Sequence, residues 1–209
     1  MKKGTVFVQG DFANAQTGKL FSTYGYEPVD SLLKADIVCW TGGSDINPAI
    51  YGERLAGCHG FSKKRDEEDL QAIKEAQGKF LVGICRGAQL LNCVPNGGTL
   101  WQDVNMHNGG NHSVRDLITG ETGFVNSLHH QQMRPGPLAE VIAVSELSTA
   151  KYSDAGTWNK KSDPLDVDVE AVYYSGTRSL CLQWHPEFSI EGFSGQYFNR
   201  LLDRYYLAA

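Results

Sequence analysis

Three short apolar runs in the first half of the chain constrain the fold most, because each ends at a glycine-containing turn or at a lone cysteine. They cover residues 5–8, 36–40 and 79–84. Apolar runs of this length are typical of strands that are buried on both faces, as in a parallel sheet. Helical spacing of apolar residues over 66–77 and 87–94 predicts a helix on each side of the third run. This alternation of strands and helices predicts an α/β layered fold.

The second half of the chain is richer in predicted strands, which cover residues 114–118, 123–126, 140–144, 167–173 and 179–184. In the segment 167–173, apolar and polar residues alternate, which predicts a strand with one buried and one solvated face. The polar, turn-rich residues 153–164 predict a flexible loop. An apolar stripe at helical spacing from Phe193 to Tyr205 predicts a final helix that packs on the core.

Composition favours one ordinary globular domain over residues 1–209. The net formal charge of −5 argues against a nucleic-acid-binding protein. No run approaches the roughly 20 apolar residues of a membrane span, and no signal-peptide core follows Met1. The five cysteines include no C-x-x-C pair, so neither a disulfide framework nor a zinc knuckle is predicted. We therefore expect a cytoplasmic protein with reduced cysteines, in which Cys39, Cys93 and Cys181 belong to the core.

The segment around Cys85 has the pattern of a nucleophile on a sharp turn. Cys85 lies between a predicted strand and a predicted helix, with Gly83 and Gly87 two residues to each side. In a nucleophile elbow the strand and the helix pack so closely that a Cβ at either flanking position would collide. The N–H groups at the start of the helix favour the thiolate form of the cysteine. Cys85 is therefore the candidate nucleophile, and a buried cysteine beside an ordinary turn is the alternative.

His185 and Glu187 supply the partners that a thiol nucleophile needs. They follow the apolar run 179–184, and strand ends of α/β sheets collect functional groups. His185 can carry a proton near neutral pH, and Glu187 can fix the tautomer of its imidazole. A zinc-deaminase site also begins with His-x-Glu, but it needs a downstream Pro-Cys-x-x-Cys that this chain lacks.

Two further segments contain candidate binding groups. The glycine pair that follows the second strand can present the backbone N–H of Gly43, which with the N–H of Arg86 would form an oxyanion hole. Residues 126–132 contain adjacent histidines with amide neighbours, which suit either a polar substrate or a surface cluster. We expect His107 and His112 to be solvated residues of the glycine- and asparagine-rich loop near 105–111.

Taken together and in this order, the motifs resemble the class I glutamine amidotransferase superfamily. The similarity is greatest to its γ-glutamyl-γ-aminobutyrate hydrolase and γ-glutamyl hydrolase branch. The matching segments are residues 42–48 with 51–53, 83–87 with 89–92, 97–103, 126–131 and 183–188. The resemblance spans about residues 36–190, although residues 134–166 do not match the family pattern.

The resemblance implies a flavodoxin-like, three-layer α/β/α fold with a mainly parallel central sheet and extra antiparallel strands in the second half. It implies that Cys85 attacks the γ-carbonyl of a γ-glutamyl amide to form a thioester, with His185 as proton carrier and Glu187 as its support. The residues implied in the oxyanion hole and in substrate binding are Gly43, Arg86, Gln89, Ser127, His129 and His130. No metal and no cofactor is implied.

The same triad would serve two kinds of enzyme. One is a stand-alone hydrolase of glutamine or of γ-glutamyl amines, and the other is a glutaminase subunit that delivers ammonia to a separate synthetase. A catalytically silent binding protein on the same fold is a third interpretation. The expected ligand is a small γ-glutamyl molecule, and both a homodimer and a synthetase partner stay open.

Overall fold

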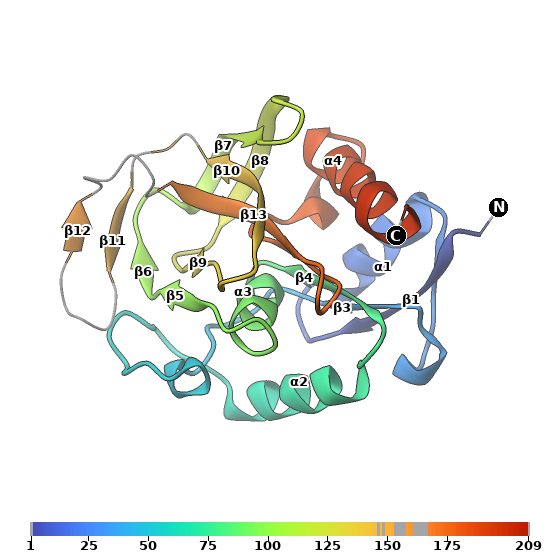
Figure 1. Cartoon of the computed structure of the whole chain (residues 1–209), viewed down its shortest axis with the longest axis horizontal. Helices are drawn as coiled ribbons and strands as arrows, with labels where there is room; N and C mark the ends of the chain where they lie inside the picture. The colour runs from blue at the N-terminus through green and yellow to red at the C-terminus, as the bar shows by residue number, and fades with distance from the viewer. Residues whose placement is uncertain (1, 146, 148, 153–157, 161–166, 209) are drawn as a thin grey trace.

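The computed structural model describes residues 2–145, 147, 149–152, 158–160 and 167–208. Its centre is a sheet with the strand order β2-β1-β3-β4-β14-β13-β10-β7-β8 (Figure 1). The strands of this sheet are β1 (Gly4–Gln9), β2 (Tyr26–Pro28), β3 (Ile37–Trp40), β4 (Phe80–Ile84), β7 (Asn108–Asp116), β8 (Thr122–Leu128), β10 (Glu140–Ser145), β13 (Asp168–Tyr174) and β14 (Ser179–Leu182). The pairings from β2 to β14 are parallel, and those from β14 to β8 are antiparallel.

Helices cover both faces of the parallel half of the sheet (Figure 1). They are α1 (Asn14–Thr23), α2 (Lys63–Glu75), α3 (Arg86–Cys93) and α4 (Phe193–Leu202), which continues into a π-helical turn (Asp203–Leu207). The buried side chains of α1 and α4 share one hydrophobic core, and those of α2 and α3 belong to the other. The three-layer α/β/α arrangement predicted from the sequence is therefore confirmed.

Strand β3 shows why the apolar runs had to be central strands. Ile37 and Cys39 face the core beneath α1 and α4, whereas Val38 and Trp40 face the core beneath α2 and α3. All of these side chains are fully buried. A strand that contributes to two cores has no solvent face, which accounts for a continuous apolar run without alternation.

Smaller elements surround this frame. Three short 3₁₀ helices lie at Leu32–Lys34, Pro48–Tyr51 and Pro186–Phe188. Two small sheets pair β5 (Thr99–Trp101) with β9 (Gln132–Arg134), and β6 (Asp103–Val104) with β11 (Ala150–Tyr152) and β12 (Trp158–Lys160). Of the predicted loop 153–164, residues 153–157 and 161–164 lie outside the described residues, and the part between them forms β12.

Two predictions for the second half were wrong. Strand β13 is buried along its whole length rather than on one face, because Asp168 and Glu170 point into a buried polar cluster. Of the segment expected to be a loop near 105–111, residues 108–111 form the start of β7, and His107 and His112 are 0% and 5% exposed rather than solvated.

The three cysteines that were predicted to belong to the core are buried. Cys39 in β3, Cys93 in α3 and Cys181 in β14 are buried as predicted, and all five cysteines are free. Cys58 is half-buried, with its thiol 3.9 Å from the carbonyl oxygen of Ile46. Among the described residues, no helix has the length and apolar character needed to cross a bilayer.

Candidate active site

Cys85 occupies a strained turn between β4 and α3. Its φ of 52° and ψ of −109° are rare for a residue with a side chain, and such strain concentrates at functional sites. A Cβ added to Gly83 would lie 2.5 Å from the backbone nitrogen of Ala88, and one added to Gly87 would lie 2.2 Å from the carbonyl oxygen of Trp40. Because both neighbours are backbone atoms, only glycine fits at either position.

His185 and Glu187 meet at the end of β14. The His185 Nδ1 lies 2.6 Å from Glu187 Oε1, and both side chains are buried. Burial by itself lowers the pKa of His185, but the charge of the Cys85 thiolate, a hydrogen bond to that sulfur and the Glu187 carboxylate outweigh it and raise the pKa to about 10. Because its pKa is raised, His185 is protonated at neutral pH and can donate a proton.

The backbone of His185 is held by a residue that the sequence analysis did not single out. The side-chain amide of Asn126 donates to the His185 carbonyl oxygen at 2.7 Å, and its oxygen accepts from the His185 N–H at 2.8 Å. Gly42 lies against the imidazole itself, since a Cβ there would be 2.6 Å from His185 Cε1. Asn126 belongs to the motif at residues 126–131, but its partner His185 lies 59 residues away in the sequence, so local spacing could not predict this contact.

Gly43 and Arg86, the candidate oxyanion residues, are neighbours in space. Gly43 has a φ of 151°, and a Cβ there would lie 3.3 Å from Arg86 Cδ. Arg86 is the first residue of α3, so its N–H has no acceptor within the helix. The two segments that the sequence analysis assigned to the oxyanion hole are thus brought together.

The side chain of Arg86 belongs to a buried network of ion pairs. The Arg86 guanidinium donates to Asp69 Oδ2 at 2.5 Å and to Asp66 Oδ1 at 2.6 Å, and it is 1% exposed. Asp69 also accepts from Arg65 Nε at 2.8 Å, and Arg65 reaches Asp11 beyond β1. Acidic residues near the start of a helix are favoured by its dipole, so those of α2 did not require a distant partner. The i,i+4 spacing of Arg65 and Asp69 was the available hint.

Two of the predicted binding residues, Gln89 and His129, meet at one carbonyl group, and a third, Ser127, lies behind His129. Gln89 Nε2 donates to the Gln131 carbonyl oxygen at 3.0 Å, and His129 Nδ1 lies 2.9 Å from the same oxygen. Ser127 Oγ is 3.4 Å from His129 Nε2. Burial and the nearby His107 hold the pKa of His129 well below its ordinary value. His129 is therefore a neutral ring whose Nδ1–H donates to Gln131 and whose Nε2 is an acceptor.

His130 points away from that group. Its Nε2 lies 2.9 Å from Asp45 Oδ1 and its Nδ1 lies 3.4 Å from Asp103 Oδ1. Burial opposes protonation, but both carboxylates favour it, and the pKa of His130 is raised. The exposed His59 stacks on His130 at a ring distance of 4.1 Å and an angle of 7°. Among the described residues, His59, Asp103 and His130 form one of two groups whose donor atoms lie close enough for a metal ion.

The second such group consists of His107, His112 and Glu170, which are fully or almost fully buried. His112 lies in β7, in the antiparallel half of the sheet, and His107 directly precedes that strand. The prediction that both were solvated gave no reason to pair them with β13.

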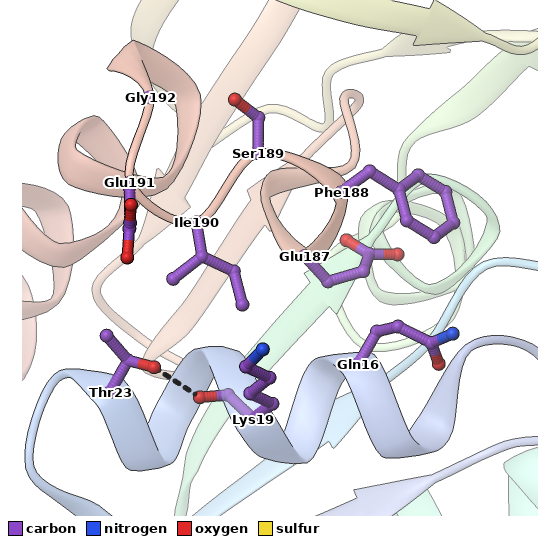
Figure 2. A pocket seen from close by; sticks show the side chains of 9 residues that line it. All are labelled: Gln16, Lys19, Thr23, Glu187, Phe188, Ser189, Ile190, Glu191 and Gly192. Carbon is purple, nitrogen blue, oxygen red and sulfur yellow. Dashed lines mark hydrogen bonds between the residues drawn. The ribbon is translucent and has the colours of Figure 1, made fainter.

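A cavity of about 450 Å³ lies on the α1 side of Glu187 (Figure 2). Gln16 and Lys19 project into it from α1, and Ile190 faces them from the segment that follows the triad. Neither Cys85 nor His185 lines it. The cavity therefore borders Glu187 rather than the nucleophile.

Comparisons with known proteins agree with this geometry. A family model described as Peptidase C26 matches residues 26–187. The glutamine amidotransferase-like protein YvdE of Lactococcus lactis subsp. lactis is 31% identical over 167 residues, which are 77% of this chain and 69% of that protein. The carbamoyl phosphate synthase small chain of Lactococcus lactis subsp. cremoris is 29% identical over 121 residues, which are 57% of this chain and 29% of that protein.

Solved structures share the fold. PurLQS from Thermotoga maritima superposes with a TM-score of 0.63 at 16% identity, over 100% of this chain and 99% of that chain. A glutamine amidotransferase from the same organism gives a TM-score of 0.58 at 13% identity, over 96% and 84% of the two chains. At these identities the superpositions show a common architecture and nothing finer.

Proposed function

The chain belongs to the Peptidase C26 family, and we propose that it hydrolyses a γ-glutamyl amide bond, in glutamine or in a γ-glutamyl amine, through a Cys85 thioester. One observation carries the proposal. Cys85 sits on a strained turn at the start of α3, and it interacts with His185, whose Nδ1 is held by Glu187. This is the arrangement of nucleophile, base and orienting carboxylate that covalent acyl transfer requires.

The proton pathway follows from the hydrogen bonds of His185. Because Nδ1 bonds Glu187, Nε2 is the nitrogen that serves Cys85. The Cys85 thiolate attacks the γ-carbonyl carbon, and a tetrahedral intermediate forms. His185 Nε2–H then protonates the departing amine, and the C–N bond breaks to leave the γ-glutamyl thioester. The same nitrogen next removes a proton from water, which attacks the thioester and releases glutamate.

The oxyanion of each tetrahedral intermediate would accept hydrogen bonds from the backbone N–H groups of Gly43 and Arg86. One such donor contributes about 3 kcal/mol to lowering the barrier. Gly43 is suited to the task because its φ of 151° is open chiefly to glycine. The buried ion network fixes the arginine side chain, so that the backbone of Arg86 is pre-positioned.

The glutamyl end of the substrate would lie against Gln89, Ser127 and His129. The neutral His129 Nε2 is an acceptor, and it suits the α-ammonium group of a glutamyl substrate. We place His130 at the margin of this pocket rather than inside it, because both of its nitrogens face carboxylates.

A second candidate function is a glutaminase subunit that delivers ammonia to a separate synthetase. The observation that favours it is a cluster of exposed apolar side chains beside the triad. Phe12 and Phe188 contact the His185 ring at centroid distances of 5.7 and 5.1 Å, and they are 41% and 44% exposed. Exposed aromatic groups at a catalytic opening suit a covering partner. The similarity to a carbamoyl phosphate synthase small chain supports the same alternative.

A substrate panel with the purified chain alone separates the two functions. Glutamine, a set of γ-glutamyl amines and γ-glutamyl peptides are assayed for glutamate release, with Cys85→Ala as the inactive control and Cys58→Ala as the matched active control. Robust turnover of a γ-glutamyl amine without any partner supports the hydrolase. Turnover restricted to glutamine and seen only after a synthetase is added supports the subunit. No turnover in either setting, together with unlabelled Cys85 after treatment with a glutamine-analogue electrophile, refutes both.

A further inference from the structure

Next to Ser127 lies a buried polar cluster that the proposed reaction does not use. His107 directly precedes β7, His112 lies within β7, and Glu170 lies in β13. The three residues are 0%, 5% and 0% exposed, and the rings of the two histidines are 4.8 Å apart at a nearly perpendicular angle. Two strands that are separate in the sheet order thus place three metal-binding side chains in one interior space.

The donor atoms of this cluster converge. Glu170 Oε1 lies 3.1 Å from His112 Nε2 and 3.8 Å from His107 Nδ1, and all three atoms lie within 4.8 Å of one another. Zinc–ligand bonds of about 2.0–2.2 Å in tetrahedral geometry separate neighbouring ligand atoms by about 3.3–3.6 Å. Ser127 Oγ is 3.0 Å from His107 Nδ1, close to where a fourth ligand would stand.

The second nitrogen of His107 faces a carboxylate, which is a common arrangement for a metal-binding histidine. His107 Nε2 lies 3.2 Å from Asp168 Oδ2, and Thr149 Oγ1 donates to both oxygens of Asp168 at 2.8 and 2.9 Å. A carboxylate behind an imidazole fixes its tautomer and raises its strength as a ligand. With Nε2–H donating to Asp168, Nδ1 keeps its lone pair, and it lies 3.0 Å from Ser127 Oγ and 3.8 Å from Glu170 Oε1.

Glu170 supplies an independent indication. Its carboxylate is fully buried, and its Oε2 has no hydrogen-bond partner among the described residues. A buried charged oxygen without a partner is costly, and such groups are normally paired or bound to a metal. A cation held by this carboxylate would satisfy both oxygens while leaving the imidazole rings neutral.

We propose that His107 Nδ1, His112 Nε2 and the Glu170 carboxylate bind one divalent transition-metal ion, with zinc as the best fit. Two imidazoles and one carboxylate are a ligand set that suits such ions. Ser127 Oγ or a water molecule completes the coordination. The burial of the site makes it a structural centre that ties β7 to β13 and holds Ser127 in place, rather than a second catalytic centre. This assignment does not depend on the proposed amide hydrolysis.

The other candidate group fits a metal less well. The rings of His59 and His130 are almost parallel, so their nitrogen lone pairs lie in parallel planes and do not converge on one point. His130 is also paired with Asp45 through one nitrogen and faces Asp103 with the other. This group therefore serves as the internal comparison for the test.

The experiment uses the full chain with Cys85 blocked by iodoacetamide, so that the catalytic thiol cannot bind metal. Metal is removed with a chelator, and Zn²⁺ is then titrated by calorimetry. Co²⁺ is added to a second sample, and its visible and near-ultraviolet absorption is recorded. We expect one Zn²⁺ per chain, a rise in melting temperature with Zn²⁺, and Co²⁺ spectra without a thiolate charge-transfer band.

Three variants locate the ion. Glu170→Gln should weaken Zn²⁺ binding by more than 100-fold, and Asp168→Asn, which keeps every ligand, should weaken it by roughly 10–100-fold. His59→Ala, at the comparison group, should bind as tightly as the parent chain. Absence of stoichiometric Zn²⁺ binding by the parent chain would overturn the proposal, whatever the variants do. So would a thiolate band, or undiminished binding in both Glu170→Gln and Asp168→Asn.

Discussion

Substitution of Asp69 by asparagine tests the buried ion network behind the proposed oxyanion hole. Asp69 is fully buried and accepts from Arg65 Nε at 2.8 Å, from Arg86 Nη1 at 2.5 Å and from Gln9 Nε2 at 3.1 Å. Asparagine keeps the shape but removes the charge, which leaves two buried guanidinium groups short of one carboxylate. Removing one partner from a buried ion pair costs about 3–5 kcal/mol.

That loss is large enough to measure in two ways. For a chain of this length, 1 kcal/mol corresponds to a shift of about 2–4 °C in Tm, so Asp69→Asn should lower Tm by roughly 6–20 °C. Urea unfolding followed by circular dichroism gives the free energy directly. Glu68→Gln, on the same helix, is the matched control. Its side chain is 53% exposed and lies 3.7 Å from Lys64, so its effect should stay within about 0.5 kcal/mol.

A double variant checks the mechanism rather than the size of the effect. Arg65→Met removes one of the two cations that Asp69 contacts. The other carboxylate partner of Arg65, Asp11, is 69% exposed, so water can solvate it when the arginine is absent. Combined with Asp69→Asn, it should cost less than the sum of the single changes by about 0.5–3 kcal/mol. Strict additivity, or a loss below about 1 kcal/mol for Asp69→Asn alone, would refute the reasoning.

Four further predictions concern the triad and its surroundings. Cys85→Ala should abolish glutamate release while leaving the circular dichroism spectrum unchanged, and retained turnover would contradict the assigned nucleophile. Glu187→Gln should lower turnover and move the alkaline limb of kcat/KM to lower pH, because Glu187 helps to raise the pKa of His185 to about 10; an unmoved limb would count against that role. His130→Gln should destabilise the chain by about 1–3 kcal/mol at pH about 6. Because the pKa of His130 is raised, the difference in unfolding free energy between the two chains is present below pH 6.5, the ordinary pKa of histidine, and is lost as pH rises through the folded-state pKa. Equal differences in urea unfolding at pH about 6 and about 9 would exclude a stabilising ion pair between His130 and Asp45. Gly87→Ala should destabilise by more than about 3 kcal/mol, because its Cβ would meet the Trp40 carbonyl oxygen, whereas Gly176→Ala, with open space around it, should be nearly neutral in the same assay.

The parts of the fold that follow local rules were predictable from the sequence. The apolar runs of β3 and β4 had to be buried central strands, whereas β1 is buried only at Val6; the glycines around Cys85 had to allow close backbone contact. Helix α1 was missed because only Thr17, Leu20 and Phe21 of its ten residues are buried, and one of these is polar. Its apolar face was too narrow to give a periodic signal.

The buried polar contacts were not predictable, because their partners are distant in the sequence. His107 meets Asp168 and His112 meets Glu170 across separations of 61 and 58 residues. Without that pairing, a histidine beside glycines and asparagines indicates a loop, and an alternating Asp168 and Glu170 indicate a solvated face. The same limit applies to Arg86, whose motif position indicated an oxyanion N–H but not the carboxylates that its side chain contacts.

The most direct test of the central claim is to trap the γ-glutamyl thioester on Cys85. The purified chain is mixed with a turned-over γ-glutamyl substrate, quenched in acid during the steady state, and analysed by intact-mass and peptide mass spectrometry. We expect one added γ-glutamyl acyl group per chain, located on the peptide that contains Cys85 and absent from Cys85→Ala. Turnover without any such adduct on Cys85, or with the acyl group on another residue, would contradict it.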